Sequence, residues 1–328
     1  MADNDLRPLD GIAVAVVGAG IAGLTAARKL AKAGAAISVF EKSRGLGGRL
    51  ATRRVEGASV DHGAQYFTAR EPAFKAWVAR AKLEGAAASW APRGKDGEDD
   101  WLVGMPGMSG LVTALVDGYT VTNEKRVTAI HQMEGALTLS FEDGTSAPGF
   151  DRVVVAVPAP QAAALVRPFG APFERIADAA MAPCWTLILA LSAPFDPGFD
   201  VARDRGPLQW IACSGTKPGR QGETIVAQAN PAWSREHLEQ DAESIRDELL
   251  RLLEEAVGPM PARTHEAVHR WRYALVEKAV GETFLLSPDG RIGVCGDWLI
   301  APRVESAWAS GDGLADALIA RTLQAAHG

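Results

Sequence analysis

Gly18-Ala19-Gly20-Ile21-Ala22-Gly23 directly follows the apolar run at residues 12–17 and opens a helix-like stretch. Gly18 allows a tight turn, Gly20 lets backbone N–H groups approach a pyrophosphate, and Gly23 lets the helix pack closely on the strand. The phosphates would lie at the helix N-terminus, where unpaired N–H groups and the helix dipole favour anions. The pattern therefore predicts a dinucleotide-binding βαβ unit near the start of the chain.

A glutamate and a basic segment extend this prediction. Glu41 closes the next apolar run, residues 35–40, at roughly the 20-residue distance expected of the acid that accepts hydrogen bonds from an adenosine ribose. The segment 42–49, Lys-Ser-Arg-Gly-Leu-Gly-Gly-Arg, offers close backbone approach at its glycine pair and a bidentate phosphate donor in Arg49. A solvated basic loop is the alternative interpretation of this segment.

Bulk properties narrow the class of protein. A chain of 328 residues, 47% of them hydrophobic, predicts one large domain or two interleaved domains. The net charge of −6 argues against nucleic acid as a partner, because binding a phosphate backbone needs a basic face. Charged residues and glycines interrupt the apolar stretch at 12–40, so we expect strand, helix and strand there and no membrane span.

Cysteine and histidine spacing argues against several chemistries. Cys184, Cys213 and Cys295 form neither a CxxC pair nor a disulfide framework, and the N-terminus lacks a signal-peptide pattern, so we expect a cytoplasmic protein. The six histidines show no metal-ligand spacing, and no Gly-x-Ser-x-Gly elbow occurs. We therefore expect no metal site and no serine hydrolase.

Turn residues divide the rest of the chain into further elements. A β-meander and a strand that returns to the sheet are predicted by the strand-like runs at 119–122, 127–132, 137–141 and 153–157. Between residues 160 and 282, strands alternate with one long helix, which we expect to begin at Ser234 as N-cap and to end at Gly258-Pro259. A strand at 292–295 and a helix over about 304–324 follow.

Seven further strings carry a family resemblance when they are taken together and in order. They are Asp61-His62-Gly63-Ala64-Gln65-Tyr66-Phe67-Thr68, Gly107-Met108-Ser109, Val157-Pro158-Ala159-Pro160-Gln161, Lys217-Pro218-Gly219-Arg220, Trp233-Ser234-Arg235, His269-Arg270-Trp271-Arg272-Tyr273 and Cys295-Gly296-Asp297-Trp298. In that order they resemble the renalase family, in its bacterial form, within the FAD-dependent amine oxidase superfamily. The segment 42–49 likewise resembles the RxxGGR stretch of that superfamily.

The resemblance implies an α/β fold of the amine oxidase and p-hydroxybenzoate hydroxylase type. A discontinuous Rossmann-type FAD-binding domain is expected at residues 1–75, 105–160 and 285–328. An interleaved, mixed α+β substrate domain is expected at residues 76–104 and 161–284.

The same resemblance implies FAD as a non-covalent cofactor. The residues expected to bind it are Gly18, Gly20, Ala22, Gly23, Glu41, Lys42, Arg44, Gly48, Arg49, Ala64, Gln65, Tyr66, Val127, Gly296, Asp297, Val304 and Glu305. In the family, the backbone near Val127 contacts adenine, Asp297 binds the ribityl or pyrophosphate part, and the helix that starts near Val304 points at the flavin. Arg303-Val304-Glu305 stands where the family often has a glycine, so the sequence departs from the family pattern at the expected backbone contact.

On the substrate side, the resemblance implies catalytic roles for His269, Arg270, Trp271 and Tyr273. Strand alternation places the two arginines of this string on one face and His269, Trp271 and Tyr273 on the other. We expect the aromatic face to line a flavin pocket, with Arg270 or Arg272 near substrate phosphates. A structural histidine is the alternative for His269.

The implied activity is oxidation of isomeric dihydronicotinamide dinucleotides, 2- or 6-dihydro-NAD(P). Hydride would pass to flavin N5 and then to dioxygen or another acceptor. One alternative is a flavin amine oxidase, which generally places a lysine opposite N5. Beyond Lys125 only Lys217 and Lys278 occur, and neither is well placed by sequence. A second alternative is a non-catalytic binding protein on this scaffold, as in Rab GDP-dissociation inhibitors; Glu41, Arg49 and Asp297 argue against it.

Overall fold

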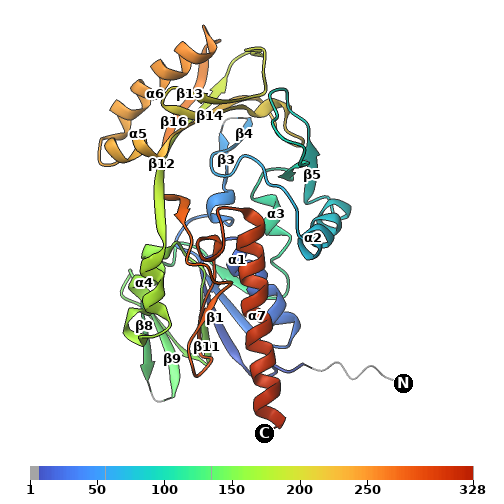
Figure 1. Cartoon of the computed structure of the whole chain (residues 1–328), viewed down its shortest axis with the longest axis vertical. Coiled ribbons are helices and arrows are strands. Elements are labelled where there is room, and N and C mark those ends of the chain that lie inside the picture. The colour runs from blue at the N-terminus through green and yellow to red at the C-terminus, as the bar shows by residue number, and fades with distance from the viewer. Residues whose placement is uncertain (1–6, 56, 134, 328) are drawn as a thin grey trace. The chain divides into compact units, whose positions relative to one another are not determined.

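The computed structural model describes residues 7–55, 57–133 and 135–327. Its internal contacts divide the chain into two units (Figure 1). The first unit comprises Met1–Gly48, Val112–Ala180 and Val276–Gly328, and the second comprises Arg49–Leu111 and Met181–Leu275. The chain is therefore interleaved, but its division differs from the expected one. Residues 49–75 and 105–111 lie in the second unit, and residues 161–180 and 276–284 lie in the first.

A six-stranded sheet organises the first unit, with strand order β17-β18-β11-β1-β2-β7. Its strands are β1 (Ala13–Val17), β2 (Ala36–Phe40), β7 (Thr120–Thr122), β11 (Arg152–Val155), β17 (Leu285–Leu286) and β18 (Ile292–Val294). All neighbours pair in parallel except β17 and β18. In an open parallel sheet of this kind, ligands bind beyond the carboxyl ends of the strands, which is where the glycine-rich turn follows β1.

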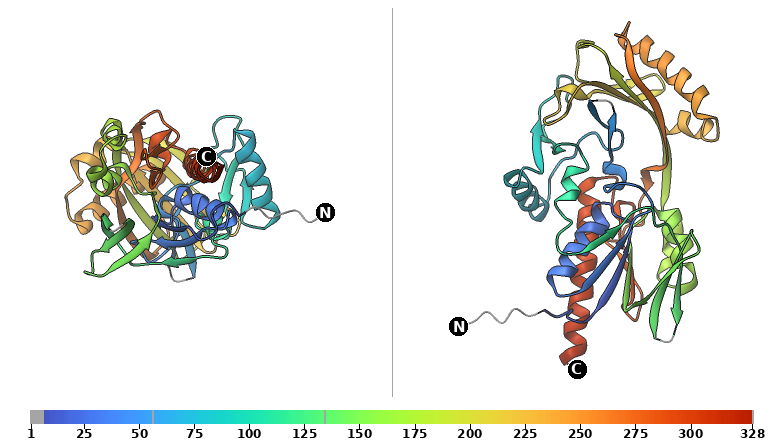
Figure 2. Two further views of the ribbon diagram at one scale, coloured as in Figure 1. Left: turned by 90° about the horizontal axis from the view of Figure 1, so that it is seen from below. Right: turned by 180° about the vertical axis from the view of Figure 1, so that it is seen from behind.

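Two helices of this unit pack against each other, α1 (Ile21–Lys32) and α7 (Val304–His327). They lie side by side both in Figure 1 and in the view from behind in Figure 2. Glycine makes this closeness possible, because a Cβ atom on Gly311 would lie 2.1 Å from the carbonyl oxygen of Ala22. Among the described residues, no helix is both long and apolar enough to cross a membrane.

The expected meander exists, with one change in its strands. It consists of β8 (Val127–Met133), β9 (Ala136–Phe141) and β10 (Ser146–Phe150). The run expected as its first strand is β7, which pairs with β2 in the large sheet. The sequence pattern did not predict β10, because this strand contains Pro148 and Gly149, which are unfavourable in a strand interior. The helix α4 (Ala159–Val166) contacts β8.

The second unit is built on a five-stranded sheet of order β13-β14-β15-β12-β16. Its strands are β12 (Ala180–Leu191), β13 (Val201–Arg205), β14 (Leu208–Cys213), β15 (Glu223–Ala229) and β16 (Arg263–Lys278). The pairs β13–β14, β14–β15 and β15–β12 are antiparallel. The division between the units falls within β12 and β16.

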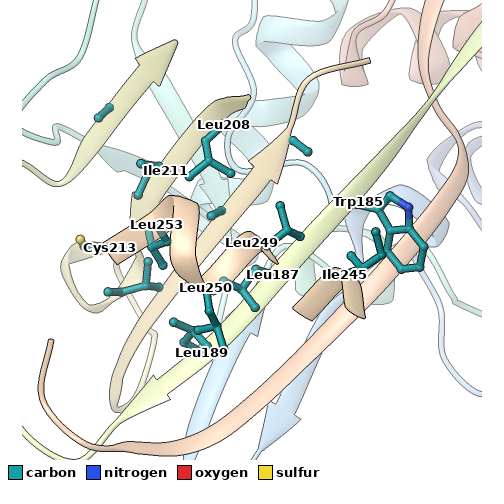
Figure 3. Close-up of a cluster of buried hydrophobic side chains, with 14 of the residues drawn as sticks. Trp185, Leu187, Leu189, Leu208, Ile211, Cys213, Ile245, Leu249, Leu250 and Leu253 are labelled. Atoms are coloured by element: carbon teal, nitrogen blue, oxygen red, sulfur yellow. The ribbon is translucent and has the colours of Figure 1, made fainter. Parts of the chain in front are cut away.

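The amphipathic helix α6 (Ala242–Val257) covers this sheet (Figure 3). Ile245, Leu249 and Leu253 are fully buried in one cluster with Leu187 and Ile211 of the strands. Removing each such side chain from water contributes about 1.5–3 kcal/mol, which makes this the main core of the unit.

The prediction of one long helix from Ser234 is wrong. The structure has two helices, α5 (Pro231–Glu236), capped by Asn230, and α6, capped by Asp241. Ser234 lies inside α5, and its buried hydroxyl accepts a hydrogen bond from the backbone N–H of Trp185 instead of capping a helix. Ser, Asn and Asp all cap helices well, so the local sequence did not distinguish them.

The remaining helices and strands lie between residues 49 and 113, and the division between the units falls within the last of them. They are β3 (Thr52–Val55), β4 (Ala58–Asp61), α2 (Pro72–Leu83), β5 (Ala87–Trp90), β6 (Trp101–Gly104) and α3 (Gly110–Thr113). Short 3-10 helices occur at Gly48–Leu50, Arg167–Phe169, Phe173–Asp178, Ser214–Thr216 and Asp297–Leu299. Val60 of β4 packs on Ile188 and Val226, so the β3–β4 hairpin is anchored on the sheet and ends at Asp61.

Candidate functional site

Packing requires two of the three glycines in the turn after β1. Gly18 has a φ of +103°, and a Cβ atom there would lie 2.6 Å from the carbonyl oxygen of Ala156. A Cβ atom on Gly23 would lie 2.2 Å from the carbonyl oxygen of Gly18. These two positions therefore hold the turn and α1 close to the sheet, as their places in the motif predict.

Gly20 differs from both, because a Cβ atom on it would meet no atom of the described residues within 4 Å. Gly20 is the N-cap of α1, and in the described part of the chain no side chain caps that helix. Gly47 runs beside it, donating its N–H to the carbonyl oxygen of Ala19 at 2.9 Å. Next to it, Gly48 has a φ of +53°. An uncapped helix N-terminus between two glycine turns fits a pyrophosphate.

Glu41 lies at the end of β2 and is buried. Its carboxylate accepts hydrogen bonds from the N–H of Ala19 at 2.9 Å and of Ser43 at 2.8 Å. A carboxylate accepts about four hydrogen bonds, so it also has lone pairs for ribose hydroxyls. Glu41 therefore closes the turn as well as offering a ribose acceptor.

The segment before β8 lies beside Glu41. The N–H of Lys125 donates to the carbonyl oxygen of Glu41 at 2.9 Å, and the N–H of Glu41 donates to the carbonyl oxygen of Thr122. Val127, two residues further on, is the buried first residue of β8. The structure thus brings the expected adenine-side and ribose-side residues onto neighbouring segments.

The other expected cofactor residues of this unit have varied surroundings. The side chains of Lys42 and Arg44 are exposed. Ala22 is buried in α1, where its carbonyl group faces Gly311, so it serves helix packing. Asp297 is buried and accepts a hydrogen bond from the N–H of Trp298 at 2.9 Å.

The C-terminal motif continues into α7. Val304 is the first residue of that helix, and Glu305 is buried in its first turn. The N–H of Gly296 donates to the hydroxyl of Ser310 at 2.9 Å, which ties the motif to the same helix. The glycine turn, the buried acids and the uncapped helix together form a donor and acceptor set that fits a flavin dinucleotide.

Four expected residues, Arg49, Ala64, Gln65 and Tyr66, lie in the second unit. The Arg49 side chain donates to the carbonyl oxygen of Ala274 at 3.3 Å, and its own carbonyl oxygen accepts from the N–H of Ala64 at 2.8 Å. The side-chain amide of Gln65 is buried, donating to the carbonyl oxygens of Asp61 and Gly63. The Gln65 side chain therefore holds the backbone of residues 61–63 in place. The sequence analysis did not predict this role.

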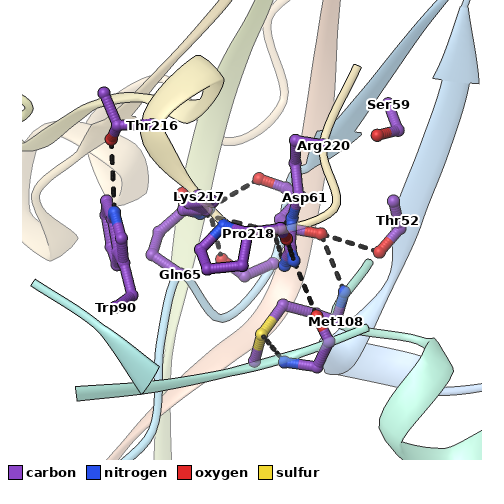
Figure 4. A network of polar contacts seen from close by, with 12 residues as sticks. Thr52, Ser59, Asp61, Gln65, Trp90, Met108, Thr216, Lys217, Pro218 and Arg220 are labelled. Carbon is purple, nitrogen blue, oxygen red and sulfur yellow. Dashed lines mark hydrogen bonds and ion pairs between the residues drawn. The ribbon is translucent and has the colours of Figure 1, made fainter. Parts of the chain in front are cut away.

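A buried ionic network surrounds Asp61 (Figure 4). Arg220 donates to Oδ2 of Asp61 through Nε at 3.0 Å and Nη2 at 2.5 Å, and Lys217 Nζ lies 3.3 Å from the same oxygen. The other oxygen accepts from the hydroxyl of Thr52 at 2.7 Å and from the N–H of Met108 at 2.9 Å. The side chains of Asp61, Lys217 and Arg220 are fully buried.

The network carries two cations and one carboxylate, and this imbalance shifts their protonation. Burial lowers the pKa of Lys217 to about 8, since Asp61 compensates only in part while Arg220 opposes the charge. Burial alone would raise the pKa of Asp61, but Lys217, Arg220 and the N–H of Met108 together lower it. The carboxylate therefore stays ionised at neutral pH.

Three rings meet beside this network. His62 follows Asp61 directly, and its ring centroid lies 5.0 Å from that of His269 and 5.4 Å from that of Trp271. The indole N–H of Trp271 donates to the carbonyl oxygen of His62 at 2.8 Å. Burial lowers the pKa of His62 to about 3, and the nearby His269 and Arg53 add to the effect. In the described part of the chain, Nδ1 of His62 has no hydrogen-bond partner.

The opposite face of β16 carries the arginines. Arg270 donates to the carbonyl oxygen of Leu238 at 2.7 Å, and both Arg270 and Arg272 form ion pairs with Glu239. Glu239 is thus the ionic partner of both arginines in this structure, and the expectation that one of them meets substrate phosphates stays a prediction. Tyr273 is half-buried on the face of His269 and Trp271.

The sequence analysis considered Lys217 only for the amine oxidase alternative and gave no role to Asp61, His62 or Arg220. All four residues lie in strings that carry the family resemblance. Their function depends on contacts across more than 150 residues of sequence. Among the described residues, no group of His, Cys, Asp or Glu side chains is arranged to hold a metal ion.

Comparison with known families gives two matches. The model for flavin containing amine oxidoreductases matches residues 84–319, and that for an NAD(P)-binding Rossmann-like domain matches residues 16–81. The match with coproporphyrinogen III oxidase of Mycobacterium leprae is 31% identical over 265 residues, covering 67% of this chain and 57% of the relative. That with protoporphyrinogen oxidase 2 of Arabidopsis thaliana is 42% identical over 72 residues, covering 22% and 14%. The chain thus spans 57% of the length of the first of these two relatives and 14% of the second.

Two solved structures illustrate the same fold. A protein from Exiguobacterium sp. 255-15, assigned as a protoporphyrinogen oxidase, superposes with a TM-score of 0.75 at 13% identity, covering 95% of this chain and all of the other. Putrescine oxidase bound to putrescine superposes with a TM-score of 0.72 at 16% identity, covering 94% and 99%. At these identities the likeness shows the fold alone. The expected α/β fold with a Rossmann-like part is thereby confirmed.

Proposed function

Because the chain belongs to the flavin containing amine oxidoreductase family, we propose that it is an FAD-dependent oxidase of isomeric dihydronicotinamide dinucleotides, reduced at ring position 2 or 6. The chemistry that the flavin supplies when bound is hydride acceptance from the dihydronicotinamide and transfer to dioxygen with one proton, giving NAD(P)⁺ and hydrogen peroxide. The protein binds and orients the two rings.

The observation that carries the choice of substrate is the state of Lys217. Amine oxidases of this fold generally place a lysine opposite flavin N5 to hold a water molecule, whereas Lys217 is fully buried and bonded to Asp61 and Gln65. Lys278, the other candidate, is an exposed residue at the end of β16. This argues against amine oxidation through either lysine.

The surroundings of His62 suit a dihydronicotinamide ring. The His62, His269 and Trp271 rings offer flat surfaces, and His62 is uncharged at neutral pH because its pKa is about 3. An uncharged imidazole cannot repel the positive charge that develops on the nicotinamide as hydride leaves. Oxidation restores the aromatic ring, so no strong general base is needed.

We propose non-covalent attachment of the cofactor. Cys295, the cysteine next to the flavin motif, is fully buried, and burial raises its thiol pKa to about 12. A thiol held in its protonated form is a poor nucleophile. Acid or heat should therefore release intact FAD from the yellow protein, and a flavin that stays with the denatured chain would contradict this.

The proposed function is tested by anaerobic reduction of the purified flavoprotein in a stopped-flow spectrophotometer. We expect rapid bleaching by 2- or 6-dihydro-NAD(P) and slow or no bleaching by ordinary NADH, by mono- and polyamines, or by coproporphyrinogen III. His269→Ala should slow the bleaching at saturating substrate and leave the flavin spectrum unchanged, whereas Lys278→Met should have little effect. Rapid bleaching by an amine that Lys278→Met abolishes would establish an amine oxidase, and rapid bleaching by the porphyrinogen would establish a porphyrinogen oxidase.

A further inference from the structure

An aromatic cluster of the second unit lies outside the ring group of His62. Tyr66 stacks on Trp101 with centroids 3.8 Å apart and an interplanar angle of 12°, and both rings lie within 6 Å of Trp210. Trp101 and Trp210 are almost completely buried, so the cluster is rigid. In the described residues, the buried indole N–H of Trp210 has no hydrogen-bond partner.

Arg203 is seated on this cluster. It lies directly opposite Trp210 in the β13–β14 ladder, and its guanidinium carbon is 4.6 Å from the centroid of the Trp210 ring. One of its terminal nitrogens, Nη2, donates to the hydroxyl of Tyr66 at 2.9 Å. Stacking and this hydrogen bond together fix the orientation of a cation that is otherwise flexible.

The guanidinium has more donors than the protein uses. Arginine presents five N–H groups, and in the described part of the chain the contacts of Arg203 with Tyr66 and Asp96 both involve Nη2. Nε and Nη1 therefore keep N–H groups for an oxyanion, and the N–H of Nη2 that now meets Asp96 would complete a bidentate edge with one of them when a ligand replaces Asp96. Some 36% of the Arg203 side chain remains exposed, so a ligand can reach it.

Asp96 is the present ionic partner of Arg203, at 3.2 Å. It belongs to the acidic stretch 95–100, which contains no helix or strand. Its side chain is 62% exposed, and an ion pair between exposed groups adds little to stability. A ligand with a higher charge can therefore displace it at little cost.

We propose that Arg203, held on Trp210 and Tyr66, binds a phosphate group of the dinucleotide substrate, and that this phosphate takes the place of Asp96. The identity of the ligand rests on the proposed function. The chemistry rests on the site itself, because a chain of net charge −6 needs a fixed local cation to hold a phosphate. A loss of the Asp96 contact on binding would couple the stretch 95–100 to substrate.

The test is isothermal titration calorimetry of the flavin-loaded protein with NAD⁺, ADP and adenosine. We expect NAD⁺ and ADP to bind and adenosine, which has no phosphate, to bind at least tenfold more weakly. Arg203→Gln should weaken NAD⁺ binding roughly tenfold to a hundredfold, the loss expected for hydrogen bonds to a charged group. Asp96→Asn should strengthen it severalfold, because the competing carboxylate is gone.

Arg205→Gln is the matched control, since Arg205 is an exposed arginine of the same strand that lies opposite Leu208. It removes the same charge and should change the affinity less than twofold. Equal weakening by both substitutions, no weakening by Arg203→Gln, or no binding of NAD⁺ to the wild type would overturn the proposal. Arg203-dependent binding without flavin bleaching by the dihydro isomers would instead preserve this site and refute the proposed activity.

Discussion

Asp61 shows how a single residue joins several of the strings that carry the family resemblance. Its two oxygens are shared among Arg220, Lys217, Thr52 and the N–H of Met108, so the segments around residues 52, 108 and 217 meet at one carboxylate. Lys217 and Arg220 would otherwise be two buried positive charges without compensation. His62 directly follows Asp61, so the contacts that fix Asp61 also fix the position of His62.

Removing the carboxylate should therefore cost more than removing one cation. We expect Asp61→Asn to lower the free energy of unfolding by about 3–5 kcal/mol, the range for an uncompensated buried charge. Lys217→Met should have a smaller effect, because the two hydrogen bonds from Arg220 to Oδ2 of Asp61 remain. Chemical denaturation of the flavin-loaded protein measures both, and a larger loss in Lys217→Met would contradict the assigned role of Asp61.

The three glycines of the turn between β1 and α1 have different roles. Gly18 and Gly23 are glycine because backbone atoms leave no room for a Cβ atom, whereas Gly20 faces open space with an ordinary φ of −80°. Packing within the protein thus accounts for two of the three. For Gly20, the proposed reason is the approach of a pyrophosphate to the backbone at that point.

Two alanine substitutions separate these roles. Gly23→Ala places its Cβ atom 2.2 Å from the carbonyl oxygen of Gly18, so we expect a lower melting temperature of the apoprotein. Gly20→Ala should leave the apoprotein as stable as the wild type and weaken FAD binding tenfold or more, since the methyl group enters the pyrophosphate site. Thermal denaturation without flavin and a titration with FAD measure the two effects. Unchanged FAD affinity in Gly20→Ala would mean that the pyrophosphate lies elsewhere.

At the scale of the whole molecule, buried ionisable groups set the response to acid. The folded-state pKa of His62, about 3, lies below its ordinary value of 6.5. Above pH 6.5 the ring is neutral in both the folded and the unfolded chain and adds no pH dependence. Between pH 6.5 and 3 the His62 ring is protonated in the unfolded chain but neutral in the folded protein. The free energy of unfolding therefore decreases as the pH falls through this range.

His62→Phe should reduce this loss while keeping a ring beside Trp271. We expect the melting temperature of the variant to fall less than that of the wild type between pH 6.5 and 4, with similar slopes above pH 7. The remaining slope would come from carboxylates such as Asp61, whose pKa is also lowered in the folded protein. Parallel curves for the two proteins over the whole range would show that His62 does not titrate in this way.

The glycine-rich turn, Glu41 and the strands around them could be predicted from the sequence because their geometry is local. A tight turn and a close helix–strand contact require particular residue types at fixed spacing, and the structure places Gly18, Gly20 and Gly23 accordingly. The alternation along β16 similarly predicted two faces for residues 269–273. The family match then agrees with the class of fold that these elements predict.

Tertiary structure alone decided which side chains meet. Lys217 and Arg220, the cationic partners of Asp61, lie 156 and 159 residues away along the chain. Glu239, which forms ion pairs with Arg270 and Arg272, comes from the loop before α6. The burial that makes His62 uncharged and the stacking that orients Arg203 also arise only when distant segments pack. Sequence periodicity determines the face of an element on which a residue lies, whereas its charge state and its partner depend on what covers that face.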